Sequence, residues 1–258
     1  MKDFKGFTLV EVAIVLVIVG LLLGGLMATL RQTTENAKRS ETNALLAEAK
    51  EALIGFSMAN GRLPCPADPT IATGAANAGS ERVGCTLAAD RAGALPWVTL
   101  GIAETDAWGR RFSYSVTPSF ADDSSTTATF IPPATCIPAP NPTQSSFALC
   151  SDGDITIRNV EGGATSIAAG IPAVIISHGR NGFNAYLSTG TQIIDPSSGA
   201  DENSNAINDA GTPAELVSTT PRDPDPSAVP PRTEYDDLVI WISPNILKSK
   251  MITAGKLP

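Results

Sequence analysis

The sequence predicts an α+β protein in which a long N-terminal helix, transmembrane in its first part and amphipathic in its second, packs on an antiparallel β-sheet C-terminal domain. Two observations predict this class. An almost unbroken apolar run extends from Val12 to Leu30. After it, short β-like runs alternate with turns rich in Gly, Pro, Asn and Ser. With 258 residues, 43% of them hydrophobic, the remainder of the chain can also bury a core.

The apolar run is long enough to cross a lipid bilayer. Its 19 residues extend about 30 Å as a helix, which is the thickness of the hydrocarbon core. It is also too long for the core of an ordinary signal peptide. We therefore expect residues 7–30 to form the transmembrane part of the N-terminal helix.

Residues 31–60 are expected to continue this helix as an amphipathic arm. Apolar residues recur there at three- to four-residue spacing among charges, as in Leu46, Ala49 and Leu53. Gly61, with Pro64 just beyond, is typical of a helix end. Such an arm must bury its apolar face, and we expect it to pack on its own β-domain and on neighbouring subunits.

Glu11 is unusual because it places a carboxylate inside the apolar segment. A charge there costs on the order of 3 kcal/mol, and the next basic residue after it is Arg31. Cleavage of the chain after Gly6 would supply a nearby cation, the new α-amino group of Phe7. The alternative is that Glu11 lies at the membrane interface and extends its carboxylate to water.

The run KGFTLVE at residues 5–11 resembles the class III signal of type IV prepilins and type II secretion pseudopilins. The resemblance implies that residues 1–6 are a leader, that a prepilin peptidase cuts after Gly6 and methylates Phe7, and that Glu11 is the assembly glutamate. It also implies partners: other pilin or pseudopilin subunits and the assembly platform of the inner membrane. Many members of this family carry a proline midway along the segment, which this chain lacks.

Four cysteines indicate an oxidising compartment for the body of the chain. They have no C-x-x-C spacing, so disulfides are favoured over a zinc site. Three pairings are possible, and we favour Cys65 with Cys85 and Cys136 with Cys150 because both close short loops.

Lys and Arg lie on both sides of the apolar run, so the distribution of positive charge does not decide the orientation of the chain. The expected location is instead based on the cysteines and the family signal. We expect a single-pass protein of the bacterial inner membrane with residues 61–258 as a β-rich domain in the periplasm. Once assembled, the chain would lie in a pseudopilus or an extracellular pilus.

Within the body, the pattern predicts five strands, two loops and a closing helix. The helix should begin after Ser243, with proline at its first position, and end at about Ala254. The strands are expected at residues 112–117, 127–131, 155–160, 173–177 and 238–242, and the long loops at 132–146 and 219–232.

The run DAWGR at residues 106–110 is similar to the D-x-W-G turn of major pseudopilins of type II secretion. This similarity favours a pseudopilin. A tight turn with a buried tryptophan would explain the same residues.

An acidic stretch offers oxygen ligands at alternating positions, as calcium loops do. Ala206 stands where such a loop needs glycine and Thr212 where it needs an acid, so a plain solvated loop is the alternative. Major pseudopilins, which the chain resembles, carry calcium in a C-terminal loop. Asp236 and Asp237 could contribute or face solvent. The proposed Ca²⁺ ligands are Asp201, Asn203, Asn205 and Asp209.

The sequence gives no support for an enzyme or a nucleic-acid-binding protein. Its only histidine, His178, follows Ser177, which cannot point at it from an alternating strand. A hairpin turn closed by Asn181 and Gly182 is the preferred interpretation. Phosphate loops, dinucleotide fingerprints and zinc motifs are missing, and basic residues do not cluster outside the helix.

The function expected from all this is a structural subunit of a type IV pilus-like filament or type II secretion pseudopilus, more specifically a minor pseudopilin. Two alternatives remain: a minor pilin of a surface type IV pilus, and a non-assembling, membrane-anchored periplasmic binding protein. Glu11 distinguishes an assembling subunit from the non-assembling binding protein, because a simple anchor has no use for a carboxylate in the membrane.

Overall fold

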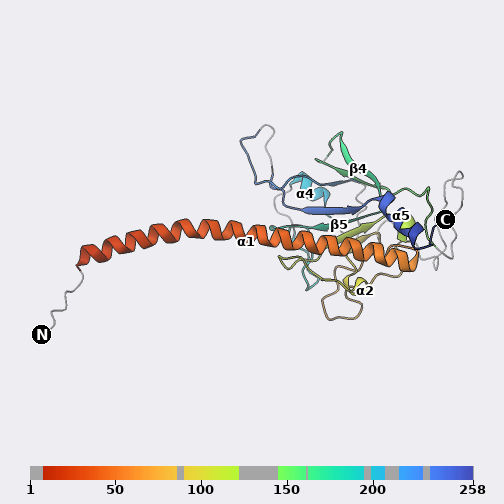
Figure 1. Ribbon diagram of the computed structural model, residues 1–258, viewed down its shortest axis with the longest axis horizontal. Helices are drawn as coiled ribbons and strands as arrows, with labels where there is room; N and C mark the ends of the chain where they lie inside the picture. Colours follow the sequence, from red (N-terminus) through yellow and green to blue (C-terminus); the bar gives the residue numbers. More distant parts are fainter. Residues whose placement is uncertain are drawn as a thin grey trace. The chain divides into compact units, whose positions relative to one another are not determined.

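The protein has twelve secondary-structure elements among the residues that the computed structural model describes (Figure 1). These residues are 8–85, 90–121, 145–160, 162–194, 199–206, 215–228 and 233–257, without the side chains of 22–31. The chain divides into two compact units, Met1–Glu41 and Thr42–Pro258. Helix α1, Leu9–Asn60, contributes residues to both.

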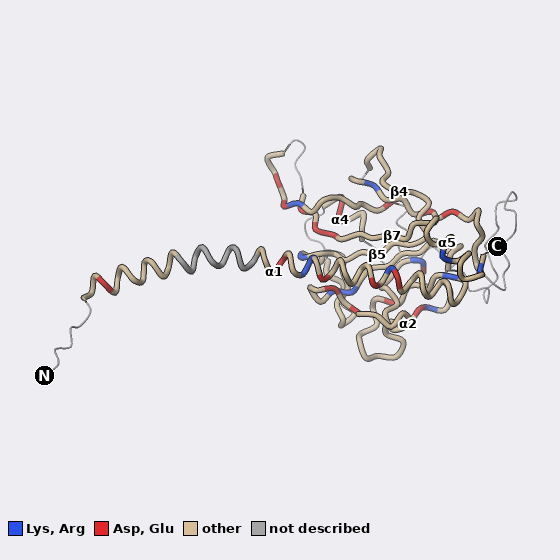
Figure 2. The backbone as a smooth tube through the Cα atoms, viewed as in Figure 1, with Lys and Arg blue, Asp and Glu red and all other residues tan. Residues whose placement is uncertain are grey.

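The first unit contains the N-terminal part of α1. Every described side chain from Leu9 to Leu21 is exposed, and Glu11 is the only charged residue among them (Figure 2). In the described part of the chain, no helix is both long and apolar enough to cross a membrane. The transmembrane segment expected at residues 7–30 includes residues 22–30, whose side chains lie outside that part, so it stays a prediction.

The second unit is built on a four-stranded antiparallel sheet in the order β1-β2-β5-β7. In its centre Ile175 pairs with Tyr114 on one side and Ile240 on the other. The bounds of these strands are β1 Ala92–Ala94, β2 Ser113–Val116, β5 Ala173–Ser177 and β7 Leu238–Ile242. This confirms the α+β class and places β2, β5 and β7 within or at the residues where strands were expected.

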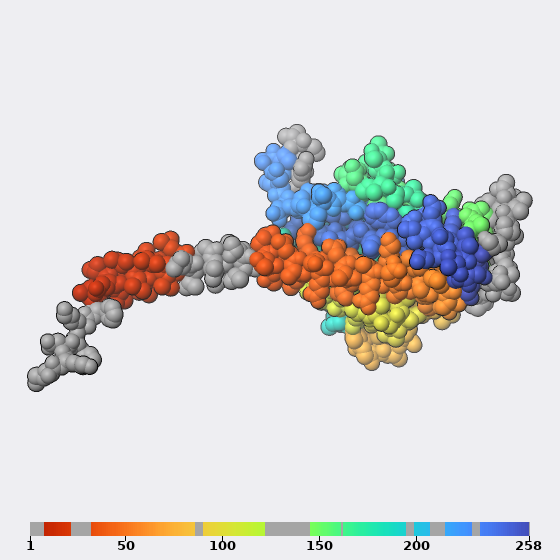
Figure 3. Space-filling view, viewed as in Figure 1, coloured from red at the N-terminus to blue at the C-terminus, as the bar shows by residue number. Residues whose placement is uncertain are grey.

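One face of this sheet packs against α1. Leu46, Ala49 and Leu53 of the helix are buried in one core with Tyr114 and Ile175. The closing helix α5, Pro244–Thr253, adds Leu247 and Met251 to the same core. Its surface adjoins that of α1 in Figure 3. The helix α1 ends at Asn60, where Gly61 takes a positive φ of 77° and donates its N–H to the Ser57 carbonyl.

The other face is covered by a second, three-stranded sheet that the sequence did not predict as a separate layer. Its order is β4-β3-β6, and its strands β3 and β6 are parallel. Alternate residues of β5, Val174 and Ile176, pack against Ile155 and Ile157 of β3. The strands are β3 Ile155–Arg158, β4 Ser166–Ile171 and β6 Glu215–Val217. Strand β5 is therefore buried on both faces, which explains its continuous apolar sequence.

Short helices lie in the connections between strands, namely α2 Trp97–Leu100, α3 Pro118–Ala121 and α4 Ala200–Ser204. A disulfide joins Cys65 to Cys85. Cys150 is also in a disulfide, but Cys136 lies outside the described residues, so its pairing stays a prediction. The strand expected at 127–131 and most of the loop expected at 132–146 also lie outside them.

Candidate functional site

Reciprocal hydrogen bonds between Thr8 and Glu11 cap the start of α1. The Glu11 carboxylate accepts from the Thr8 N–H at 2.8 Å and from the Thr8 hydroxyl at 2.9 Å. The Thr8 hydroxyl in turn accepts from the Glu11 N–H at 3.3 Å. This is a capping box, in which two N–H groups at the helix start are satisfied by side chains three residues apart.

The T-x-x-E spacing of this capping box lies within the processing signal, and neither sequence interpretation of Glu11 includes it. Glu11 therefore has a local partner before any second chain is present. Gly6 and Phe7, on either side of the expected cleavage point, lie outside the described residues, so cleavage there stays a prediction.

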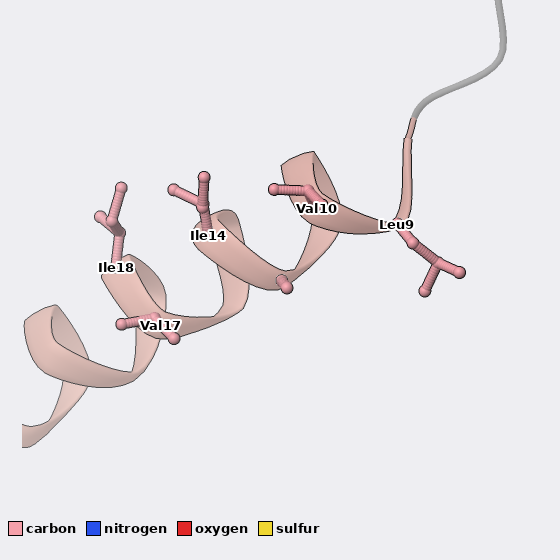
Figure 4. A pocket seen from close by; sticks show the side chains of 6 residues that line it. Leu9, Val10, Ile14, Val17 and Ile18 are labelled. Carbon is pink, nitrogen blue, oxygen red and sulfur yellow. The ribbon is translucent and has the colours of Figure 1, made fainter.

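Beyond the capping box, α1 presents an apolar surface. Val10, Ile14 and Ile18 point to the same side of the helix, at four-residue spacing (Figure 4). With Val17 they line a shallow hollow along the helix. An exposed apolar stripe of this kind is typical of a surface that a lipid or another helix covers.

The structure describes three of the four predicted calcium ligands, Asp201, Asn203 and Asn205, and these three do not converge on one point. Asp201 and Asn203 lie in α4, where residues two apart point in different directions. The Asp201 carboxylate is bound by Arg222 at 2.5 Å. The Asn205 side chain pairs with both backbone groups of Val217, each at 2.9 Å. Asp209 lies outside the described residues.

A different acidic group forms instead, from Glu202 in α4 and the two residues before β7, Asp236 and Asp237. One carboxylate oxygen from each lies within 4.8 Å of the others, and we call this trio the acidic cluster. Each residue is at most 3% exposed, so Asp236 and Asp237 do not face solvent. The sequence could have suggested Asp236 and Asp237 as a pair, but their proximity to Glu202 depends on how α4 packs.

The acidic cluster is held by donors from the 178–182 loop and from Asn205. The Asn181 backbone N–H donates to Asp236 Oδ2 at 2.9 Å, and its side-chain amide donates to Glu202 Oε1 at 2.9 Å. Asn205 Nδ2 donates to Asp237 Oδ2 at 2.8 Å. Among the described residues, Asp236 Oδ1 is buried without a hydrogen-bond partner.

Burial and the repulsion of neighbouring carboxylates raise the pKa of two members of the cluster, Glu202 and Asp236. Desolvation is the largest cause that raises the pKa of Glu202 to about 7, and the neighbouring Asp237 and Asp236 raise it further. Desolvation likewise raises the pKa of Asp236 to about 6. Glu202 and Asp236 therefore bind protons more readily than exposed carboxylates do.

A serine, a histidine and an aspartate also meet beside the acidic cluster. The Ser113 hydroxyl lies 2.9 Å from His178 Nε2, and His178 Nδ1 lies 3.7 Å from Asp237 Oδ1. Ser113 and Asp237 are 3% exposed and His178 is 1% exposed. A nucleophile must contact its substrate, so this burial inside the sheet favours a structural role for the three residues.

Two sequence interpretations of nearby turns need correction. The turn after β5 does not close a hairpin, because β5 pairs with β2 and β7 rather than with a strand that follows directly. In the 106–110 turn the buried residue is Asp106, whereas Trp108 is half-buried. Asp106 Oδ1 accepts the N–H groups of Trp108 and Arg110 at 2.9 and 3.0 Å, and Asp106 Oδ2 accepts the Ser177 hydroxyl at 2.6 Å.

Comparison with known proteins gives a match at the N-terminus. Residues 1–27 match the prokaryotic N-terminal methylation motif. No curated protein and no solved structure matches the chain significantly. The match indicates a type IV pilin-like N-terminus, of the kind that a prepilin peptidase processes and that assembles with other pilin subunits.

Proposed function

We propose that this chain is a structural subunit of a type II secretion pseudopilus or type IV pilus-like filament, most specifically a minor pseudopilin. The observation that carries the proposal is the methylation motif of residues 1–27. The exposed apolar stripe of Val10, Ile14 and Ile18 directly after Glu11 supports it, because such a stripe needs a lipid or helix partner. The chain would be anchored in the inner membrane by residues 7–30, with its body in the periplasm.

The 106–110 turn supports a pseudopilin over a minor pilin of a surface pilus, which is the second candidate. Asp106 in this turn anchors the N–H groups of Trp108 and Arg110, an arrangement that suits the D-x-W-G resemblance. The inner-membrane assembly platform would be the partner in either case.

Processing provides the direct test. Co-expression with a prepilin peptidase should remove residues 1–6 and methylate Phe7, and Gly6→Ala should block both changes. Intact-mass measurement resolves the two products. An unshifted wild-type mass in the presence of active peptidase would overturn the proposal.

Assembly provides the second test. Glu11→Ala should leave insertion and cleavage intact, since an apolar helix is the better membrane solute. It should lose filament assembly, measured by cross-linking or shearing in a strain without the native copy. Thr8→Val is the matched control, because it opens the capping box and keeps the carboxylate. Assembly of Glu11→Ala at the wild-type level would show that Glu11 is not an assembly residue.

We also propose that the acidic cluster holds a divalent cation, with Ca²⁺ as the best candidate for three buried carboxylates. The specific observation is Asp236 Oδ1, a buried oxygen with no hydrogen-bond partner among the described residues. A cation that binds only the folded chain would stabilise it by mass action. This proposal uses Glu202, Asp236 and Asp237 in place of the ligands expected from the sequence.

The chain itself offers a matched control for this test. Calcium should raise the melting temperature of the full chain in detergent, and Glu202→Gln or Asp237→Asn should remove the gain. Asp209→Asn, in the originally expected set, should keep it. A wild-type melting temperature that millimolar calcium leaves unchanged would reject the cation site.

A further inference from the structure

The 178–182 loop has two polar sides with different partners. On one side its carbonyl oxygens accept from the Arg110 guanidinium, with distances of 2.6 Å at Gly179, 2.8 Å at Arg180 and 3.4 Å at Asn181. On the other side Asn181 donates to Asp236 and Glu202. One short loop thus lies between a guanidinium and the acidic cluster.

Two glycines let the loop come this close to both partners. Gly182 has a φ of +67°, and a Cβ there would lie 1.8 Å from Arg110 Nε. Gly179 has a φ of +55°, and a Cβ there would lie 2.3 Å from the Asp236 carbonyl oxygen. Both positions therefore require glycine, which adopts a positive φ readily and has no Cβ to clash with Arg110 or Asp236.

Arg110 is itself fixed by the 106–110 turn. Its N–H donates to Asp106 Oδ1 at 3.0 Å, and its carbonyl oxygen accepts the Asp106 N–H at 2.8 Å. Ala107, which follows Asp106 in this turn, donates its N–H to the Thr42 hydroxyl of α1 at 3.3 Å. The turn therefore joins the loop beside the acidic cluster to the arm of α1.

We infer that Arg110 is the positioning residue of the acidic cluster. Its guanidinium donates to the loop carbonyls, so it acts on Asp236 and Glu202 through Asn181. The planar guanidinium spans three successive carbonyls, which the single ammonium of a lysine cannot do. The inference rests on the proposed cation site for its binding readout, but its structural part stands independently.

The experiment compares wild type with Arg110→Lys and Arg110→Ala, as full chains in detergent. The control is Arg158→Lys, since Arg158 also binds a loop carbonyl, that of Gly163, but far along the chain from the acidic cluster. Calcium affinity is measured by calorimetry, and amide exchange of the 178–182 loop is measured after chelation. We expect both Arg110 variants to bind calcium about tenfold more weakly or worse, as for other residues that orient ligands, and to exchange the Asn181 amide faster.

The outcomes separate the two proposals. If the wild type binds no calcium but the Asn181 backbone amide still exchanges faster in the Arg110 variants than in the wild type, the cation site fails and the positioning role stands. If wild type and both variants bind calcium equally and exchange Asn181 equally, the positioning role is overturned. Amides of β5 report global unfolding, and Arg110→Lys carries the test if Arg110→Ala does not fold.

Discussion

The two acidic sites of this chain, Glu11 and the acidic cluster, are stabilised in opposite ways. Glu11 is exposed and takes its hydrogen bonds from Thr8, three residues away. Glu202 is buried, and its carboxylate oxygen accepts from Asn181 and from the Asp236 N–H, 21 and 34 residues away in sequence. A change at Glu11 should therefore be felt locally, whereas a change in the cluster should alter the stability of the whole body.

The largest stability effect is expected for Asn205→Ala. The Asn205 side chain binds the backbone N–H and carbonyl of Val217 and also Asp237, all in the buried interior. Its removal leaves these groups without a partner, which should lower the free energy of unfolding by about 2–4 kcal/mol. Urea unfolding measures this. Asn203→Ala, on the exposed side of α4, should cost less than about 0.5 kcal/mol, and equal losses would contradict the interpretation.

A pH dependence of stability should distinguish the cluster from ordinary carboxylates. The pKa of Glu202 in the folded chain is about 7, above its ordinary value of 4.5. Folding therefore favours the protonated form, so this stabilisation is fully present below pH 4.5 and is lost as pH rises through 7.

The measurement is chemical unfolding between pH 5 and 8 after removal of divalent cations. Wild type should lose about 1–3 kcal/mol more than Glu202→Gln over this range. If the free energy of unfolding changes equally with pH in the two proteins, Glu202 does not titrate as expected. Added calcium should reduce the loss in wild type, because the cation replaces the proton.

The smallest effect is expected at the start of α1. Thr8→Val removes the hydroxyl of the capping box and should destabilise the first turn by about 1 kcal/mol. Amide exchange at Val10 to Val12 should accelerate in detergent, while the melting temperature of the body stays unchanged. A lower melting temperature of the body would mean that the two sites are not independent.

Sequence by itself determined the features that depend on neighbouring residues. The processing signal lies within residues 5–11, and the end of α1 at Gly61, strands β5 and β7, and helix α5 follow from periodicity and turn residues over short windows. The disulfide loop between Cys65 and Cys85 also matches its short spacing. The T-x-x-E capping box is equally local, but it was not predicted, because Thr8 and Glu11 also belong to the processing signal.

Only the tertiary structure decided the rest. The short strands β1 and β6 and the parallel pairing of β3 with β6 depend on contacts between distant segments, which no local pattern specifies. The acidic cluster is the clearest case. Alternation of oxygen ligands predicted a loop at residues 201–209, but residues 201–204 belong to helix α4, which turns Asp201 toward Arg222 and Glu202 toward Asp236. The helical period and the packing of α4 against the start of β7 together select the carboxylates that meet.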